Sequence, residues 1–305
     1  MEVWIQQIVN GLAIGALYAM IAVGYSMVYG VLQMINFAHG EIFMLGGFAG
    51  YLALSVLEKT AFAHDGRFFV ITIALAAGMI ASPLAAIAVE RIAYRPLRHA
   101  PRLVPLISAI GVSVFLQNLV LRLDGGRPRY YQSIFPRGGP TIGQIHIAWS
   151  QILIFAGAVI AMIVLQLFIH RTRQGKAIRA VAEDQQVAAL MGIDVDAAIM
   201  TTFVVGAMLA GLAGVMWGLQ FNQVDHFMGF VPGIKAFTAA VVGGIGSVFG
   251  AMLGGFFIGL VETLSVQALP HGFANYQDVV AFSLLILFLV LRPGGILGEH
   301  LARRA

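Results

Sequence analysis

The chain has 305 residues, of which 59% are hydrophobic and only 10% are charged. This amount of polar surface cannot cover the core of a water-soluble protein. The composition therefore excludes a soluble globule and predicts an all-α polytopic membrane protein. The net charge of +4 then reflects how basic loops are distributed across a membrane, and it does not indicate nucleic-acid binding. The lack of cysteine excludes disulfides, thiolate metal sites and thiol catalysis.

Apolar runs predict about eight transmembrane helices, with seven or nine as alternatives, because a crossing takes roughly 20 residues. The runs occupy residues 4–29, 42–57, 68–90, 103–123, 149–169, 197–220, 246–267 and 279–291. The first lacks a basic flank and a cleavage pattern, so we expect it to be retained. A shorter apolar piece precedes the glycine-rich stretch Gly243–Ser247. This pattern predicts a broken or re-entrant helix over 232–250, since irregular backbone at membrane depth must be buried in protein or line a cavity.

Basic residues predict which breaks between the spans face the cytoplasm. They are Arg91, Arg95, Arg98 and Arg102 after the third run, Arg171, Arg173, Lys176 and Arg179 in the central break, and Arg292, Arg303 and Arg304 in the tail. This assignment places the C-terminus in the cytoplasm and the N-terminus outside. It also places residues 124–147 outside, although that segment carries Arg127, Arg129 and Arg137.

The central polar break, residues 171–196, contains a short helix signature. Asp184 can cap a helix start, Val187, Leu190 and Met191 recur at i, i+3 and i+4, and Gly192 supplies a left-handed stop. A two-turn surface helix with an apolar ridge suits a groove on a soluble cytoplasmic partner. The alternative is a solvated loop with an incidental helix.

At this point the chain resembles the permease subunits of ABC importers, whose coupling helix docks on an ATPase. Ala188 and Gly192 match the small residue and the glycine of the EAA-type loop, whereas Gln186 stands where that motif has glutamate. The resemblance implies that residues 184–192 contact the ATPase.

Asn36, His39 and Glu41 lie within otherwise apolar sequence. A charged group at mid-depth costs roughly 2.5 to 3.5 kcal/mol on insertion scales, so these groups should face protein or water. If a helix begins near His39 and Gly40, its free N–H groups form an anion site and Glu41 could meet an ammonium, which makes a cradle for a zwitterionic amino acid. The alternative is that Asn36 caps the helix, Glu41 complements its dipole and His39 hydrogen-bonds a neighbouring backbone.

An internal echo points to two related halves. Met44-Leu-Gly-Gly-Phe48 recurs as Met252-Leu-Gly-Gly-Phe256, each time a few residues after a glycine-containing break. Transporters built from repeats bind substrate where discontinuous helices meet, and Gly243 and Gly244 therefore join the candidate path residues. Chance recurrence in a glycine-rich apolar chain is the alternative.

Other polar residues within the apolar sequence are interpreted as structural. Glu262 is expected either to pair with another helix or to lie near the outer end of its span. We expect Asp278 to be a helix N-terminal acid and Lys235 to be an interfacial anchor. A stripe of small residues spaced by four predicts close helix packing at Gly206, Ala210, Gly214 and Gly218.

The sequence contains no GxxxxGK[ST], no HExxH and no His and carboxylate pair at metal spacing. We therefore expect no enzymatic activity, no metal and no cofactor, with energy supplied by another subunit.

Across nearly its whole length the chain resembles the LivH-type permease of bacterial branched-chain amino-acid ABC importers. The segments that carry the resemblance are Asn10-Gly-Leu12, Gly24–Gly30, Met34–Gly40, Glu90–Arg98, Leu106–Gly111 and Lys235–Gly246. The resemblance implies an ABC importer permease fold, a single transmembrane domain over 1–305 and a place in the bacterial inner membrane. It implies as partners a LivM-type permease, two cytoplasmic ATP-binding subunits and a periplasmic binding protein for leucine, isoleucine and valine.

Two other functions stay open at this point. Urea-importer permeases share the signature Asn-x-Ala-His-Gly, here Asn36-Phe-Ala-His-Gly40, so the substrate could be urea or a short amide. A stand-alone channel or ion-coupled carrier would explain Glu41 and the repeat, but it gives the central loop no purpose.

Overall fold

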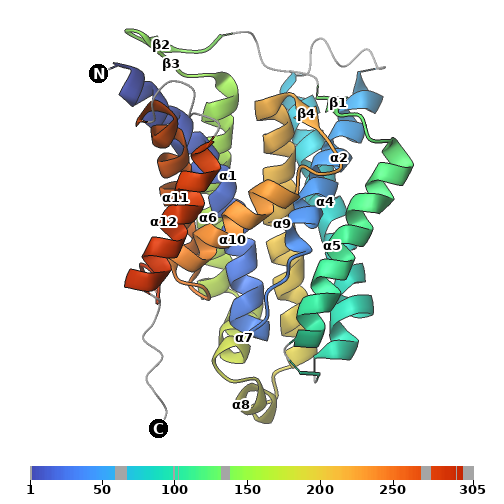
Figure 1. The fold of residues 1–305 in the computed structure, drawn as a ribbon. Coiled ribbons are helices and arrows are strands. Elements are labelled where there is room, and N and C mark those ends of the chain that lie inside the picture. The colour runs from blue at the N-terminus through green and yellow to red at the C-terminus, as the bar shows by residue number, and fades with distance from the viewer. Residues whose placement is uncertain are drawn as a thin grey trace.

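The computed structural model describes residues 2–58, 67–98, 100–101, 103–131, 138–268, 276–292 and 294–297. In these residues the chain is an all-α bundle, as predicted (Figure 1). Seven helices are long and apolar enough to cross a membrane, one fewer than the eight apolar runs and within the predicted range of seven to nine. They are α1 (Glu2–Leu32), α2 (His39–Leu57), α4 (Arg67–Val89), α5 (Leu103–Asp124), α6 (Trp149–Arg171), α9 (Val195–Phe221) and α11 (Val248–Ala268).

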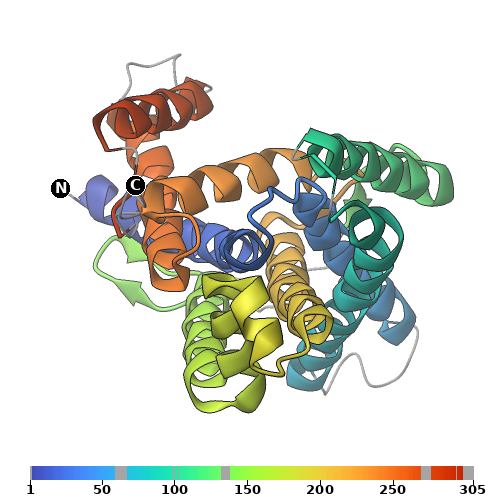
Figure 2. The same ribbon diagram turned by 90° about the horizontal axis from the view of Figure 1, so that it is seen from below.

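Two shorter apolar helices, α10 (Phe230–Gly243) and α12 (Gln277–Leu291), complete the described bundle. At 1.5 Å per residue they are only about 21 and 22 Å long, less than the hydrocarbon thickness of about 30 Å. Figure 2 shows α10 running across the bundle, from the side of α5 to the side of α11 and α12. The backbone breaks after α10, where Gly244 and Gly246 have φ of 109° and 95°. The predicted broken helix is thus confirmed.

Small residues bring the central helices into backbone contact. A methyl group added at Gly206 of α9 would lie 3.3 Å from the Cα of Gly24 in α1, and one at Gly214 would lie 2.8 Å from the Gly47 nitrogen in α2. The predicted small-residue stripe therefore does line helix contacts. The two copies of the repeated pentapeptide, at 44–48 and 252–256, both lie near the start of their helices, α2 and α11.

The bundle has two distinct ends (Figure 1). One end carries the hairpin of β2 (Thr141–Ile142) and β3 (Ile145–His146) together with the antiparallel pair of β1 (Arg129–Tyr130) and β4 (Gln223–Val224). The other end carries α7 (Arg173–Glu183) and α8 (Gln185–Leu190). Strands β1 to β3 all come from residues 124–147, so the described parts of this segment lie opposite the central polar break (Figure 1), as the predicted topology requires. Arg102, Arg137, Arg303 and Arg304 lie outside the described residues.

The third span continues past the predicted end near residue 90. A π-helical turn, η1 (Glu90–Tyr94), follows α4 directly, and a 3₁₀ turn, η2 (Arg95–Leu97), follows η1. Pro96 lies in the first turn of η2, where a missing backbone N–H costs nothing. Short π-helical insertions in helices occur frequently at functional sites.

Candidate functional site

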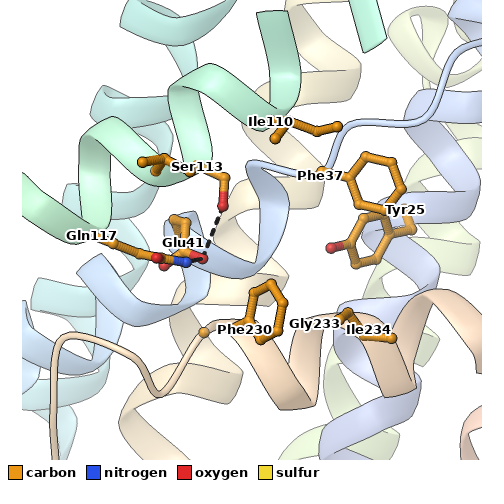
Figure 3. Close-up of a pocket in the computed structure, with 11 residues that line it drawn as sticks. Tyr25, Phe37, Glu41, Ile110, Ser113, Gln117, Phe230, Gly233 and Ile234 are labelled. Atoms are coloured by element: carbon orange, nitrogen blue, oxygen red, sulfur yellow. Dashed lines mark hydrogen bonds between the residues drawn. The ribbon is translucent and has the colours of Figure 1, made fainter. Parts of the chain in front are cut away.

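A cavity of about 310 Å³ lies among α1, α2, α5 and α10 (Figure 3). This volume is at the lower end of the range for small-molecule sites, about 300 to 1,000 Å³. Its walls are Tyr25, Phe37, Glu41, Ile110, Ser113, Val114, Gln117, Gly229, Phe230, Gly233 and Ile234.

Glu41 is the acidic group of this cavity. It lies in the first turn of α2 and is buried. Its Oε1 accepts hydrogen bonds from Ser113 Oγ at 3.1 Å and from Gln117 Nε2 at 2.7 Å, both on α5. Its Oε2 has no hydrogen-bond partner among the described residues. One carboxylate oxygen is therefore held by the protein, and the other is buried without a partner among the described residues.

Two helix starts meet beside this carboxylate. Gly40, in the first turn of α2, contacts Gly229 and Gly233, at the start of α10, through the backbone. A methyl group on Gly233 would lie 3.1 Å from the Gly40 Cα, and one on Gly229 would lie 2.9 Å from Glu41 Oε2. Both helices therefore turn the positive ends of their dipoles toward one place, which favours a negative ligand group there.

The rest of the cavity wall is apolar. Ile110 and Val114 come from α5, and Phe230 and Ile234 come from α10. In Figure 3 Tyr25 and Phe37 lie on the opposite side of the cavity from Gln117. The site thus combines one carboxylate and two positive helix ends with a surface suited to an aliphatic group.

The structure gives Asn36 and His39 surroundings different from those of Glu41, because neither lines the cavity. Asn36 Oδ1 accepts from the Ala38 amide at 3.1 Å and from the Tyr94 hydroxyl at 2.5 Å. The His39 ring is hydrogen-bonded to the backbone of Ile21 and lies edge-on to Tyr25, with 4.8 Å between the ring centroids. Asn36 therefore closes a turn just ahead of α2 and does not cap the helix, whose N-cap residue is Ala38.

Gly243 and Gly244 lie at the far end of α10 from the cavity. The Gly243 carbonyl accepts from Leu297 N at 3.0 Å, and a methyl group on Gly295 would lie 2.6 Å from the Gly244 Cα. The structure therefore does not bring these two glycines together with Glu41. It places Gly229 and Gly233 there instead.

Sequence reasoning missed the residues that complete the cavity. Ser113 and Gln117 are two polar residues four apart in an apolar span, and this spacing puts them on one face of a helix. Gly229 and Gly233 are also four apart and could have indicated a close backbone approach at a helix start. The sequence around each pair does not show that the two pairs lie close together in the fold.

The sequence suggested that Lys235 anchors the chain at the membrane interface, but the structure places it elsewhere. It is buried, and its Nζ lies 2.8 Å from Glu262 Oε1 and 2.6 Å from Asp278 Oδ1. Tyr18 completes the cluster by donating from its hydroxyl to Glu262 Oε2 at 2.9 Å. The interpretation was wrong because the two carboxylates come from α11 and α12, whose proximity the local sequence does not reveal.

The central polar break forms the expected capped helix. Asp184 Oδ1 accepts from the Gln186 and Val187 amides at 2.8 and 3.0 Å, α8 follows, and Gly192 has φ of 81°. Val187, Leu190 and Met191 are 53%, 87% and 78% exposed. They form the apolar ridge of the α8 segment, and α8 itself lies at the tip of that end of the bundle (Figure 1).

Ala188 faces inward and attaches α8 to the bundle. It is buried in one core with Ile178 and Val181 of α7. The side chain of Gln185 adds a hydrogen bond from Nε2 to the Val31 carbonyl at 2.7 Å. The short helix is therefore fixed on one face and presents an apolar ridge on the other.

Residues 7–289 match the family model described as branched-chain amino acid transport system / permease component. The chain is 45% identical over 300 residues to the high-affinity branched-chain amino acid transport system permease protein BraD of Pseudomonas aeruginosa, covering 97% of this chain and 96% of the relative. It is 42% identical over 301 residues to the corresponding LivH protein of Escherichia coli K12, with the same coverage. Among solved structures, PsaBC from Streptococcus pneumoniae aligns over 92% of this chain and 90% of its own, with a TM-score of 0.48 and 13% identity.

The family match and the relatives BraD and LivH, all permeases, agree with the seven long apolar helices of the bundle. The chain therefore belongs to the permease-component family of branched-chain amino acid transport systems.

Proposed function

We propose that this chain is a permease subunit of an ABC importer that carries leucine, isoleucine and valine across the bacterial inner membrane. A partner permease of the LivM type, two cytoplasmic ATP-binding subunits and a periplasmic binding protein complete the system. The chain itself is one non-catalytic transmembrane domain, and its partners hydrolyse ATP.

The single observation that carries the proposal is the composition of the cavity. An α-amino acid needs an acceptor for its ammonium, positive dipoles for its carboxylate and an apolar surface for its side chain. Glu41 Oε2, the two helix starts at Gly40 and Gly229, and the wall of Ile110 and Val114 supply these three features in one place. The substrates named for BraD and LivH are in keeping with this chemistry.

The ridge of Val187, Leu190 and Met191 supports ATP-driven transport. Exposed apolar side chains on a helix attached to the bundle favour a groove on a soluble partner. We assign residues 171–196 as the coupling segment and place it in the cytoplasm with the C-terminus. This orientation puts the N-terminus and the β2–β3 hairpin on the periplasmic side.

Reconstitution tests the proposal directly. The complete complex, in proteoliposomes with ATP on the ATPase side and the binding protein on the other, is expected to accumulate labelled leucine, isoleucine and valine. Uptake should disappear without ATP or without the binding protein. Labelled urea serves as the competing substrate, and accumulation of urea in place of leucine would contradict the substrate assignment.

A stand-alone carrier or channel makes a different prediction. It would let the purified chain alone move leucine into liposomes, with no need for ATP. Flux of this kind would contradict the importer assignment even if leucine is the substrate.

A further inference from the structure

The start of α2 is held by a hydrogen bond that joins the cavity to a different part of the bundle. Tyr94, in the π-helical turn η1, is buried and donates from its hydroxyl to Asn36 Oδ1 at 2.5 Å. The same oxygen accepts from the Ala38 amide at 3.1 Å. Ala38 is the N-cap residue of α2, and Glu41 follows in its first turn. The Tyr94 hydroxyl therefore fixes the turn that places Glu41.

The Tyr94 ring belongs to the core that holds the coupling segment. Its centroid lies 5.8 Å from that of Phe203 in α9, and the same core contains Val181 of α7 and Ala188 of α8. Phe37, which lines the cavity, also packs against this core. A displacement of α8 therefore reaches Tyr94 through packed side chains, because such cores are nearly incompressible.

Charge contacts attach the same turn to the start of α9. Arg98 pairs with Glu90 of η1 and with Asp196, and Arg95 also pairs with Asp196. Asp196 lies in the first turn of α9, a few residues after α8. Residues 90–98 thus contact both the end of the coupling segment and the turn before α2.

The turn before α2 and the first turn of the helix also carry buried polar atoms with no partner within the described residues. They are Asn36 Nδ2, His39 Nε2 and Glu41 Oε2. Buried polar atoms are normally paired, and each unpaired one makes this arrangement less favourable, because a buried polar group without a partner is costly.

We propose that Tyr94 is a positioning residue that transmits the displacement of the coupling segment to the start of α2. Its hydrogen bond to Asn36 makes Glu41 move relative to Ser113 and Gln117 when α8 moves. The inference rests on the proposed function, since it needs an ATPase to displace α8. To the proposed function the inference adds the route by which the displacement of α8 reaches α2, and it names Tyr94 as a residue on that route.

Tyr94→Phe tests this route because it removes one hydroxyl and keeps the ring against Phe203. In the reconstituted complex, ATP hydrolysis stimulated by the binding protein should stay within about twofold of wild type, whereas leucine imported per ATP should fall about tenfold. Tyr131→Phe is the matched control. Tyr131 is also a buried tyrosine, and its hydroxyl has no partner among the described residues. The amount of leucine imported per ATP should therefore not change in the Tyr131→Phe complex.

A second measurement follows the start of α2 without depending on the substrate. Hydrogen–deuterium exchange of amides 36–43 in the assembled complex should change when a non-hydrolysable ATP analogue binds. Tyr94→Phe should abolish that change, and Tyr131→Phe should preserve it. Asn36→Ala combined with Tyr94→Phe should lose no more coupling than the worse single variant, since both remove the same hydrogen bond.

A Tyr94→Phe complex with the wild-type transport ratio and the wild-type exchange response would overturn the inference while leaving the importer assignment intact. If the wild-type complex fails to import leucine, the substrate assignment fails, and the exchange measurement alone decides the role of Tyr94.

Discussion

Lys235 and Glu262 form an ion pair buried inside an apolar bundle, with 2.8 Å between Nζ and Oε1. The pair joins α10 to α11, and Asp278 of α12 and Tyr18 of α1 complete it. Lys235 directly follows Ile234, which lines the cavity. The ionic cluster therefore links α10, which forms one wall of the cavity, to α11, α12 and α1.

Removing Lys235 alone should destabilise the protein strongly. Lys235→Met leaves Glu262 buried without its cation, which typically costs about 3 to 5 kcal/mol. We expect a clearly lower midpoint of thermal unfolding for the purified chain in detergent, followed by tryptophan fluorescence. Lys235→Met with Glu262→Gln removes both charges and should recover part of that loss. An equal loss in the single and double variants would show that the pair does not carry the effect.

Neutralising Glu41 should impair transport without disturbing assembly. Glu41→Gln keeps an oxygen for Ser113 and Gln117 but offers the substrate ammonium no charge. Loss of a hydrogen bond to a charged group costs about 1.5 to 3 kcal/mol, so leucine uptake at low concentration should fall at least about tenfold. Initial uptake rates measure this effect, and co-purification of the partner subunits reports assembly. Unchanged uptake would remove Glu41 from the mechanism.

Filling the cavity should exclude the larger substrates. Val114→Phe adds a ring to the apolar wall, and we expect the rate of leucine and isoleucine uptake to fall more than that of valine uptake. Val164→Phe is the matched control, because Val164 is exposed on the outer face of α6. Competition among the three amino acids in proteoliposomes gives the ratio of rates. Equal effects of the two substitutions would argue against this cavity as the substrate path.

Truncating the ridge of α8 should release the ATPase. Leu190→Ser changes a side chain that is 87% exposed, so the stability of the chain should hardly change. At a partner interface the same change should cost about 2 kcal/mol, or about 30-fold in affinity. The yield of ATPase subunits that co-purify with the chain measures this loss. Ala189→Ser alters an exposed neighbour without removing apolar surface and should bind normally.

The sequence predicts those features that short-range physics determines. Spans follow from the length of apolar runs, because a bilayer requires about 20 such residues per crossing. The α8 helix follows from Asp184 and Gly192, since both act within one turn of the helix ends that they define.

The composition of the cavity depends on contacts between distant parts of the chain. Ser113 and Gln117 reach Glu41 from 72 and 76 residues away, and Lys235 meets Glu262 from 27 residues away. The role of a glycine likewise cannot be assigned from the local sequence. At Gly244 it ends a helix, whereas at Gly229 it allows two backbones to touch, and the residue type alone does not separate the two uses.

The pairing of β1 with β4 affects how α5 could move. Arg129 pairs with Val224 and Tyr130 with Gln223, just beyond the ends of α5 and α9, so one end of α5 is clamped to its neighbour. The helix has 22 residues and is about 33 Å long. A rigid rod pinned at one tip swings most at the other, which is the Leu103 tip beside η2. Any tilt of α5 about this ladder would therefore displace its Leu103 end most, on the side of the molecule where α8 lies (Figure 1), and Gln117 and Ser113 less.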